Sequence, residues 1–239
     1  MKHVLQNSWI LVRSLVGYNL KIIFANKFIY FVGAAVIIFL LVTIGNLLDP
    51  GATMNEADMY SLLLVPGMLI VFYPTTFGIQ NDLDTRMIEI LFGIPNYRYK
   101  VWLVRLVMIF FVAAVFLLIL GLVSQAALTT FPLFSMVFQL LFPLFFLGCL
   151  AFMFSTLTRN GYGTAAVIIV LGLVFWIAGE NLSENRWNVF LNPFHSPRQV
   201  NELVWSRNIV DNRIYLTIAA ILALLTGLLQ LQRREKFMR

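Results

Sequence analysis

Long apolar stretches make up most of the chain, and short segments between them hold its charged residues. The intervals without Asp, Glu, Lys or Arg run from 28 to 48, 59 to 81, 106 to 158, 160 to 179 and 214 to 232. Because a helix needs about 20 apolar residues to cross about 30 Å of hydrocarbon, four intervals hold one span and the interval 106–158 holds two. The pattern predicts an all-α integral membrane protein with a single transmembrane domain over 1–239 and six spans: 28–48, 60–80, 102–125, 132–157, 163–179 and 214–231.

Two further segments have a pattern of their own. Residues 1–27 are too polar to span, and their apolar residues gather on one half of a helical wheel, opposite Lys2, Arg13 and Lys21. This favours an amphipathic elbow helix whose basic face meets the headgroups of membrane lipids. The alternative is an extension of the first span that packs on its neighbours. Residues 180–213 form the longest loop on the outer side.

The segment 81–100, NDLDTRMIEILFGIPNYRYK, lies between the second and third spans and is unusually polar. Asn81 is a plausible N-cap, Asp82 and Asp84 suit the positive end of a helix, and Asp82 can pair with Arg86 four residues later. Gly93 and Pro95 end the pattern. The apolar side of this predicted helix comprises Leu83, Met87, Ile90 and Leu91. It either rests on lipid headgroups or docks on a soluble partner.

The distribution of basic residues indicates the orientation. The chain carries 17 Lys and Arg against 11 Asp and Glu, a net charge of +6. With six spans both termini lie on one side, which then holds thirteen of the basic residues, and the other side holds the remaining four, Arg186, Arg198, Arg207 and Arg213. Cytoplasmic loops are enriched in Lys and Arg, so we expect cytoplasmic N- and C-termini. Nucleic-acid binding is not expected.

The residues offer little catalytic chemistry. There is no Gly-rich loop ending in Gly-Lys-Ser or Gly-Lys-Thr, and the two His and one Cys are too far apart for a metal or catalytic pair. We therefore expect no catalytic, cofactor or metal site. The apolar interiors of the spans hold no charged residue, which disfavours a channel or a carrier driven by ions. Tyr73, Thr75 and Thr76 are weak candidates for a substrate path, and interhelical hydrogen bonds are the alternative.

The segment RMIEILFGIP at 86–95 resembles the coupling loop of the ABC-2 type permeases, the membrane subunits of ABC transporters. Glu89 takes the position of the family's Glu, Leu91 and Phe92 the apolar positions, and Pro95 the Pro six residues later. The chain departs from the family where Arg86 and Met87 replace a Gly-Thr pair. FSTLTRNGYGTAA, after the fourth span, is similar to the family's step before its fifth span.

This resemblance implies a permease subunit of an ATP-driven transporter, an exporter in a bacterial inner membrane, that works as a dimer with a second copy or a homologue. A separate cytoplasmic ABC ATPase would hold ATP and Mg, so the chain itself would not be an enzyme. The residues implied to contact that ATPase are Asp82, Asp84, Arg86, Met87, Glu89, Ile90, Leu91 and Pro95. The transported substrate is left open. The alternative function is a membrane scaffold that anchors a cytoplasmic partner without transport.

Overall fold

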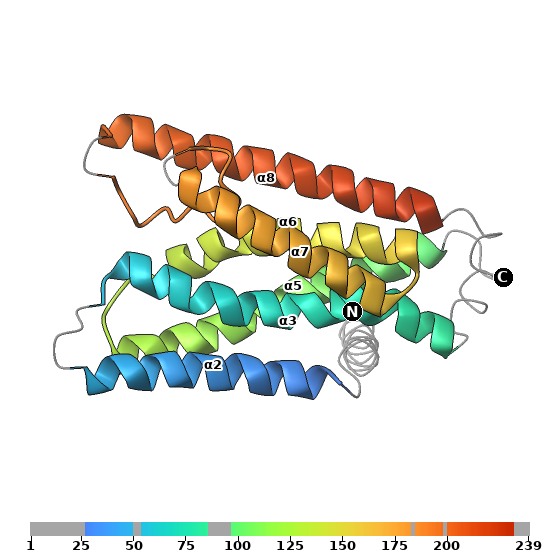
Figure 1. Cartoon of the computed structure of the whole chain (residues 1–239), viewed down its shortest axis with the longest axis horizontal. Helices are drawn as coiled ribbons and strands as arrows, with labels where there is room; N and C mark the ends of the chain where they lie inside the picture. The colour runs from blue at the N-terminus through green and yellow to red at the C-terminus, as the bar shows by residue number, and fades with distance from the viewer. Residues whose placement is uncertain (1–26, 50–53, 86–96, 183–184, 198–199, 232–239) are drawn as a thin grey trace, which may run out of the picture.

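The chain folds into a bundle of long α-helices (Figure 1). The computed structural model describes residues 27–49, 54–85, 97–182, 185–197 and 200–231. Within these residues there are six helices and no strand, and all six are long and apolar enough to cross a membrane. They are α2 (Phe28–Leu48), α3 (Glu56–Asp84), α5 (Tyr97–Ala127), α6 (Leu133–Thr158), α7 (Gly161–Asn181) and α8 (Glu202–Leu231). For the described residues, the prediction of an all-helical fold with six helices able to span a membrane is confirmed.

Successive helices run in opposite directions along the bundle, so the bundle has two distinct ends (Figure 1). At one end α3 ends, α5 begins, α6 turns into α7 and α8 ends. We call it the basic end, because five of the eight Lys and Arg among the described residues lie there: Lys27, Arg98, Lys100, Arg105 and Arg159. The other end, which we call the loop end, holds the α2–α3 and α5–α6 connections and the segment 182–201 between α7 and α8.

Helices α3 and α6 form the centre of the bundle. α3 contacts α2, α5, α6 and α7, and α6 packs on α3, α5, α7 and α8. Leu63 of α3 and Leu144 of α6 are fully buried. A Cβ on Gly148 of α6 would lie 2.8 Å from both Val71 of α3 and Phe110 of α5, so no side chain fits there. Small residues at such contacts let helices pack closely inside a membrane.

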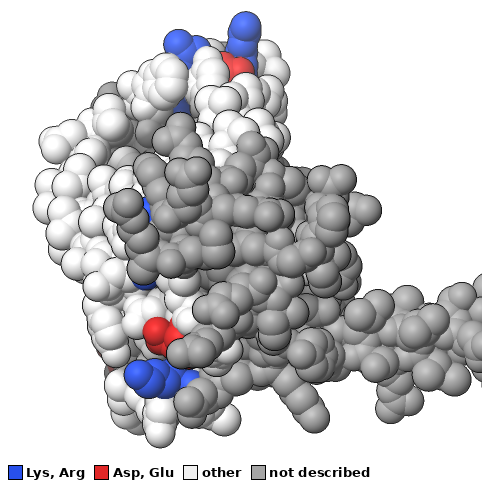
Figure 2. All heavy atoms as spheres, turned by 90° about the vertical axis from the view of Figure 1, so that its right-hand side faces the viewer, with Lys and Arg blue, Asp and Glu red and all other residues white. Residues whose placement is uncertain are grey.

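The outside of the bundle is apolar along its length. Large aliphatic side chains are exposed on the outer helices, among them Leu41 of α2, Val107 of α5 and Leu222 of α8. In Figure 2, which faces the basic end, the left-hand flank is almost entirely without charged side chains. Such a surface suits contact with lipid chains, because hydrocarbon is the solvent there.

Helix boundaries agree with the sequence pattern in part. The first, fourth and fifth spans were placed within two residues of α2, α6 and α7. The predicted N-cap at Asn81 is wrong, because α3 continues through Asn81 to Asp84. Its C-cap is Thr85, whose N–H donates to Asn81 O at 3.1 Å. The predicted loop 180–213 is too long, because α8 begins at Glu202. The elbow at 1–27 lies, except for Lys27, outside the described residues.

Candidate functional site

A buried ion pair joins α3 to α5 at the basic end. Asp82 lies in the last turn of α3, and its carboxylate accepts a hydrogen bond from Nη1 of Arg105, eight residues into α5. Asp82 is 3% exposed and Arg105 is 5% exposed. The segment 86–96 follows the end of α3 and precedes α5, in whose third turn Arg105 lies. The pair therefore ties together the two helices between which that segment runs.

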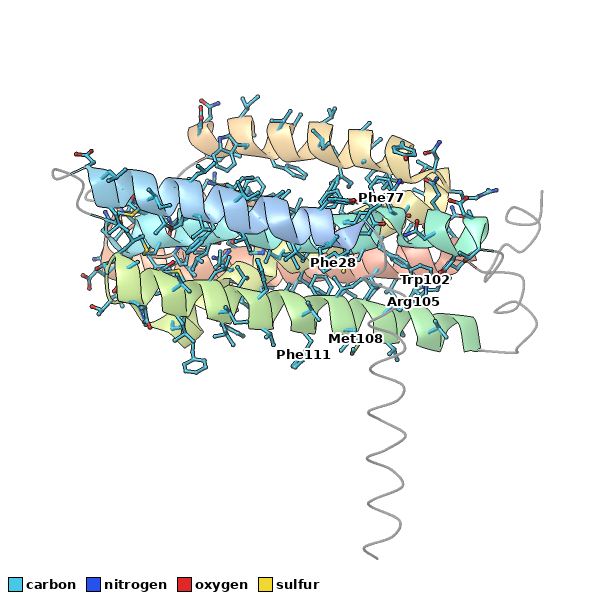
Figure 3. All side chains as sticks on the ribbon, turned by 90° about the horizontal axis from the view of Figure 1, so that it is seen from below. Phe28, Phe77, Trp102, Arg105, Met108 and Phe111 are labelled. Carbon is cyan, nitrogen blue, oxygen red and sulfur yellow. The ribbon has the colours of Figure 1, made fainter. Side chains whose placement is uncertain are left out.

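Trp102 supports the ion pair from α5. The guanidinium carbon of Arg105 lies 4.8 Å from the centre of the Trp102 ring, a distance at which the ring attracts a cation. The same ring packs 5.5 Å from Phe152 of α6 and 3.3 Å from where a Cβ on Gly78 of α3 would lie. Figure 3 shows Trp102 and Arg105 on the side of α5 that faces the bundle. The pair is thus held by three helices.

The turn between α6 and α7 docks on the same end of α3. Arg159 has a left-handed backbone (φ 55°), and the side chain of Asn160 caps α7 by accepting from the N–H groups of Tyr162 and Gly163. The N–H of Gly161 donates to Oε1 of Gln80 at 2.6 Å. A Cβ on Gly161 would lie 2.3 Å from Cδ1 of Phe77, so only Gly fits.

A second contact ties α6 to α3 one turn away. The hydroxyl of Ser155 donates to Thr76 O at 2.9 Å, and both residues are buried. A backbone carbonyl that already serves its own helix can accept this bond with its second lone pair. Together with Gln80 and Asp82, the bond joins the last three turns of α3 to α5, α6 and α7. We call this cluster of Asp82, Arg105, Gln80, Gly161 and Ser155 the basic-end junction.

Of the residues predicted to contact an ATPase, Asp82 and Asp84 are described by the structure and the others are not. Asp82 is buried against Arg105, whereas Asp84 is exposed in the last turn of α3. The remaining candidates lie in the segment 86–96, outside the described residues: Arg86, Met87, Glu89, Ile90, Leu91 and Pro95. The expected pairing of Asp82 with Arg86 lies outside them as well, and the partner that the structure gives Asp82 is Arg105.

The three candidates for a substrate path lie deep in α3 and are buried. Tyr73 packs among aromatic rings, 4.9 Å from Phe31 and 5.3 Å from Phe77. The Thr75 hydroxyl donates to Val71 O in its own helix at 2.7 Å. Of the three, Thr75 lines the apolar cavity described below. Tyr73 and Thr76 contribute no lining to it.

The loop end contains a buried arginine that the sequence pattern placed in a loop. Arg213 lies in α8 and is 6% exposed. Its Nε donates to Gln139 of α6 at 2.8 Å, its Nη2 to Leu191 O at 3.1 Å, and its Nη1 to Asn212 at 2.9 Å. No acidic partner of Arg213 is found within the described residues. One guanidinium thus connects α6, α8 and the loop between α7 and α8.

Two Asn-x-Phe steps fold that loop back onto the helices. Asn188 accepts from the N–H of Phe190 and donates to Gly179 O of α7, and Asn192 accepts from the N–H of Phe194 and donates to Ala57 O of α3. Each Asn thus forms a turn with its own backbone and anchors that turn to a helix end. Leu191, between the two steps, is fully buried.

The sequence pattern missed these buried charges. Arg105 and Arg213 mark the edges of charge-free intervals, and residues at such edges are expected near water. In the structure each edge lies inside a helix, because α5 begins at Tyr97 and α8 at Glu202. The repeated Asn-x-Phe spacing at 188–194 was the available signal for the folded loop. Arg105 gave no comparable signal, because its partner lies 23 residues away.

The comparisons with known proteins add no relative. Neither protein-family models, nor curated proteins, nor solved structures give a match to the chain. In the part of the chain that the structure describes, no three His, Cys, Asp or Glu side chains come together as a metal site would require. The candidate site therefore rests on the basic-end junction and its geometry.

Proposed function

We propose that the chain is a permease subunit of an ATP-driven exporter of the ABC-2 type. It forms the substrate path as a dimer and couples to a separate cytoplasmic ATPase, which holds ATP and Mg. The basic end faces the cytoplasm of a bacterial inner membrane, and the loop end faces outside. The segment 86–96 is the surface that contacts the ATPase.

The observation that carries this proposal is the buried Asp82–Arg105 pair. When a partner displaces this segment, the displacement must reach the membrane helices. A loop that is not fixed to those helices would move without moving them. Here the helices on both sides of the segment are joined by a desolvated ion pair, so they move together. Because α3 runs through the centre of the bundle, a displacement of its end reaches α2, α6 and α7. Packed helices respond to such a push as rigid elements.

The rest of the basic-end junction supports the same mechanism. Gln80 contacts the first residue of α7, and Ser155 contacts α3 from α6. Movement of the end of α3 therefore reaches both α6 and α7 through these two hydrogen bonds. The buried ion pair also changes the role we assign to Asp82. It holds the end of α3 in place, and the contact with the ATPase falls to Asp84 and the residues from Arg86 to Pro95.

The test is ATP hydrolysis by the complex purified with this chain from the cells that make it. Glu89→Arg reverses a charge in the segment 86–96, and we expect it to abolish co-purification of an ATPase or to uncouple hydrolysis from the permease. Glu202→Arg, at an exposed acid of the loop end, is the matched control and should have no effect. An ATPase that binds and turns over equally with Glu89→Arg contradicts the coupling assignment. An ATPase that is retained without nucleotide-dependent transport supports the scaffold instead.

A further inference from the structure

Two cavities follow one side of α3. The larger, of about 640 Å³, lies between α2, α3, α6 and α7, and the smaller, of about 490 Å³, lies between α2 and α3 nearer the loop end. Val65 lines both. The two cavities therefore adjoin at Val65.

The two cavities follow the same face of α2 and the same face of α3. On α3 the lining residues Ser61, Val65, Leu69 and Phe72 follow each other at intervals of three or four, which places them on one face. On α2 the lining residues Phe31, Ile38, Val42 and Asn46, at intervals of seven, four and four, also share one face. We call the combined space the α2–α3 groove. It runs from the loop end towards the basic end along both helices.

The groove is polar at its mouth and apolar along its depth. The deep part contains no charged side chain, and its one hydroxyl, on Thr75, is already bonded to Val71 O at 2.7 Å. The mouth at the loop end contains Asn46, Asp58 and Ser61. Oδ2 of Asp58 accepts from the N–H of Asn55 at 3.0 Å, and a carboxylate has capacity for further donors. The sequence from 49 to 58 carries three acids and no base.

The groove opens sideways to the surroundings of the bundle. Ile169, Leu173 and Trp176 of α7 line it and are 54%, 57% and 48% exposed. Figure 3 shows α7 along the upper edge and α2 in the foreground, with side chains between them. A Cβ added to Gly172, which also lines the groove, would meet no atom within 4 Å. The bundle therefore leaves this space unfilled at the depth of the hydrocarbon.

We propose that the α2–α3 groove binds a phospholipid with an amine headgroup, taken from the leaflet at the loop end. One acyl chain lies along the apolar part, and the ammonium group faces Asp58. On α3 the lining runs from Asp58 to Phe77, nineteen residues or about 28 Å, which covers the roughly 15 Å of one leaflet and extends beyond it. The acidic mouth of the groove disfavours a lipid whose headgroup carries a net negative charge. The inference does not depend on the proposed ATPase and holds for a scaffold as well.

The experiment uses the full chain in vesicles of phosphatidylcholine that contain a phosphatidylethanolamine with a photoreactive acyl chain. After illumination, crosslinked peptides are mapped by mass spectrometry. We expect crosslinks concentrated on the groove faces of α3 and α7. Gly172→Leu fills the groove and should lower them several-fold, whereas Gly33→Leu, at another glycine with open space around it but outside the groove, should not. Crosslinks spread evenly over all exposed helices, or unchanged by Gly172→Leu, would overturn the proposal.

Competition tests the headgroup. Unlabelled phosphatidylethanolamine should displace the probe several-fold better than anionic phosphatidylglycerol, and Asp58→Asn should remove this preference while Glu56→Gln keeps it. Equal competition by both lipids in the unaltered protein contradicts the role of Asp58. A cysteine at Leu173 that links two copies of the chain, with no lipid crosslinks in the groove, would show that a second copy fills it and would also overturn the lipid.

Discussion

Removing the charge of Asp82 should strongly destabilise the basic-end junction. In Asp82→Asn the side chain keeps its size, but Arg105 remains 5% exposed and positively charged without an anion beside it. Nε of Arg105 has no hydrogen-bond partner among the described residues, so the guanidinium has no second acceptor there to take the place of the Asp82 carboxylate. The helix must either keep an uncompensated buried charge or open to let water reach it.

The size of the effect follows from the surroundings of the pair. Breaking a buried ion pair by removing one partner costs about 3–5 kcal/mol. The ring of Trp102, 4.8 Å from the guanidinium, contacts the cation in both proteins, so this contact cancels in the difference. We therefore expect a loss of about 3–5 kcal/mol, which for a chain of this length lowers the unfolding midpoint by roughly 6–20 °C.

The assay is thermal unfolding of the purified protein in detergent. Asp84→Asn, which changes the exposed acid in the same turn, is the matched control and should shift the midpoint by no more than about 1 °C. Asp82→Leu combined with Arg105→Met should recover most of the loss, because an apolar pair of similar volume needs no counter-ion. If Asp82→Asn unfolds at the same temperature as Asp84→Asn, the pair does not hold α3 to α5.

Three further substitutions test other contacts by the same unfolding assay. Gly161→Ala places a methyl group against Phe77 and should lower the free energy of unfolding by about 1–3 kcal/mol. Gly163→Ala, where the methyl group meets only ordinary contacts, should leave it almost unchanged. Equal effects of the two substitutions would contradict the close packing of α7 on α3. Arg213→Leu removes three hydrogen bonds from buried partners and should lower the free energy of unfolding by about 2–4 kcal/mol. Exposed Arg207→Leu is the control and should change it by less than about 0.5 kcal/mol. Asn192→Ala should release the α7–α8 loop from Ala57 O, seen as faster proteolysis near 194 with little change in the unfolding midpoint; unchanged proteolysis would show that the contact does not hold the loop.

The sequence was sufficient for the spans because each depends on local composition. In hydrocarbon, a charge-free stretch of about 20 residues satisfies its backbone hydrogen bonds as a helix. The sequence pattern therefore predicts the ends of α2, α6 and α7 to within two residues. The start of α8 was missed because Glu202, Arg207 and Asp211 make its first turns look like a water-exposed loop. In the structure these residues already belong to α8, where Trp205 is buried and Ser206 bonds back to Leu203 O.

The candidate site was harder to predict because its partners are distant in the sequence. Asp82 looked like a helix-start residue with a local partner at Arg86, and only the packing of α5 on α3 brings Arg105 to it. Arg213 and Gln139 lie 74 residues apart. A single sequence contains no signal for such pairs, since neither residue constrains the other through local structure.

The most direct test of the account is whether the segment 86–96 touches an ATPase in the native membrane. A photo-crosslinking amino acid in place of Ile90 should yield a product with a cytoplasmic protein that also binds a photoreactive ATP analogue. The same amino acid in place of Leu203, exposed at the loop end, should not yield it. If the position of Ile90 crosslinks only to lipid, or both positions give the same product, the chain is not coupled to an ATPase through this segment.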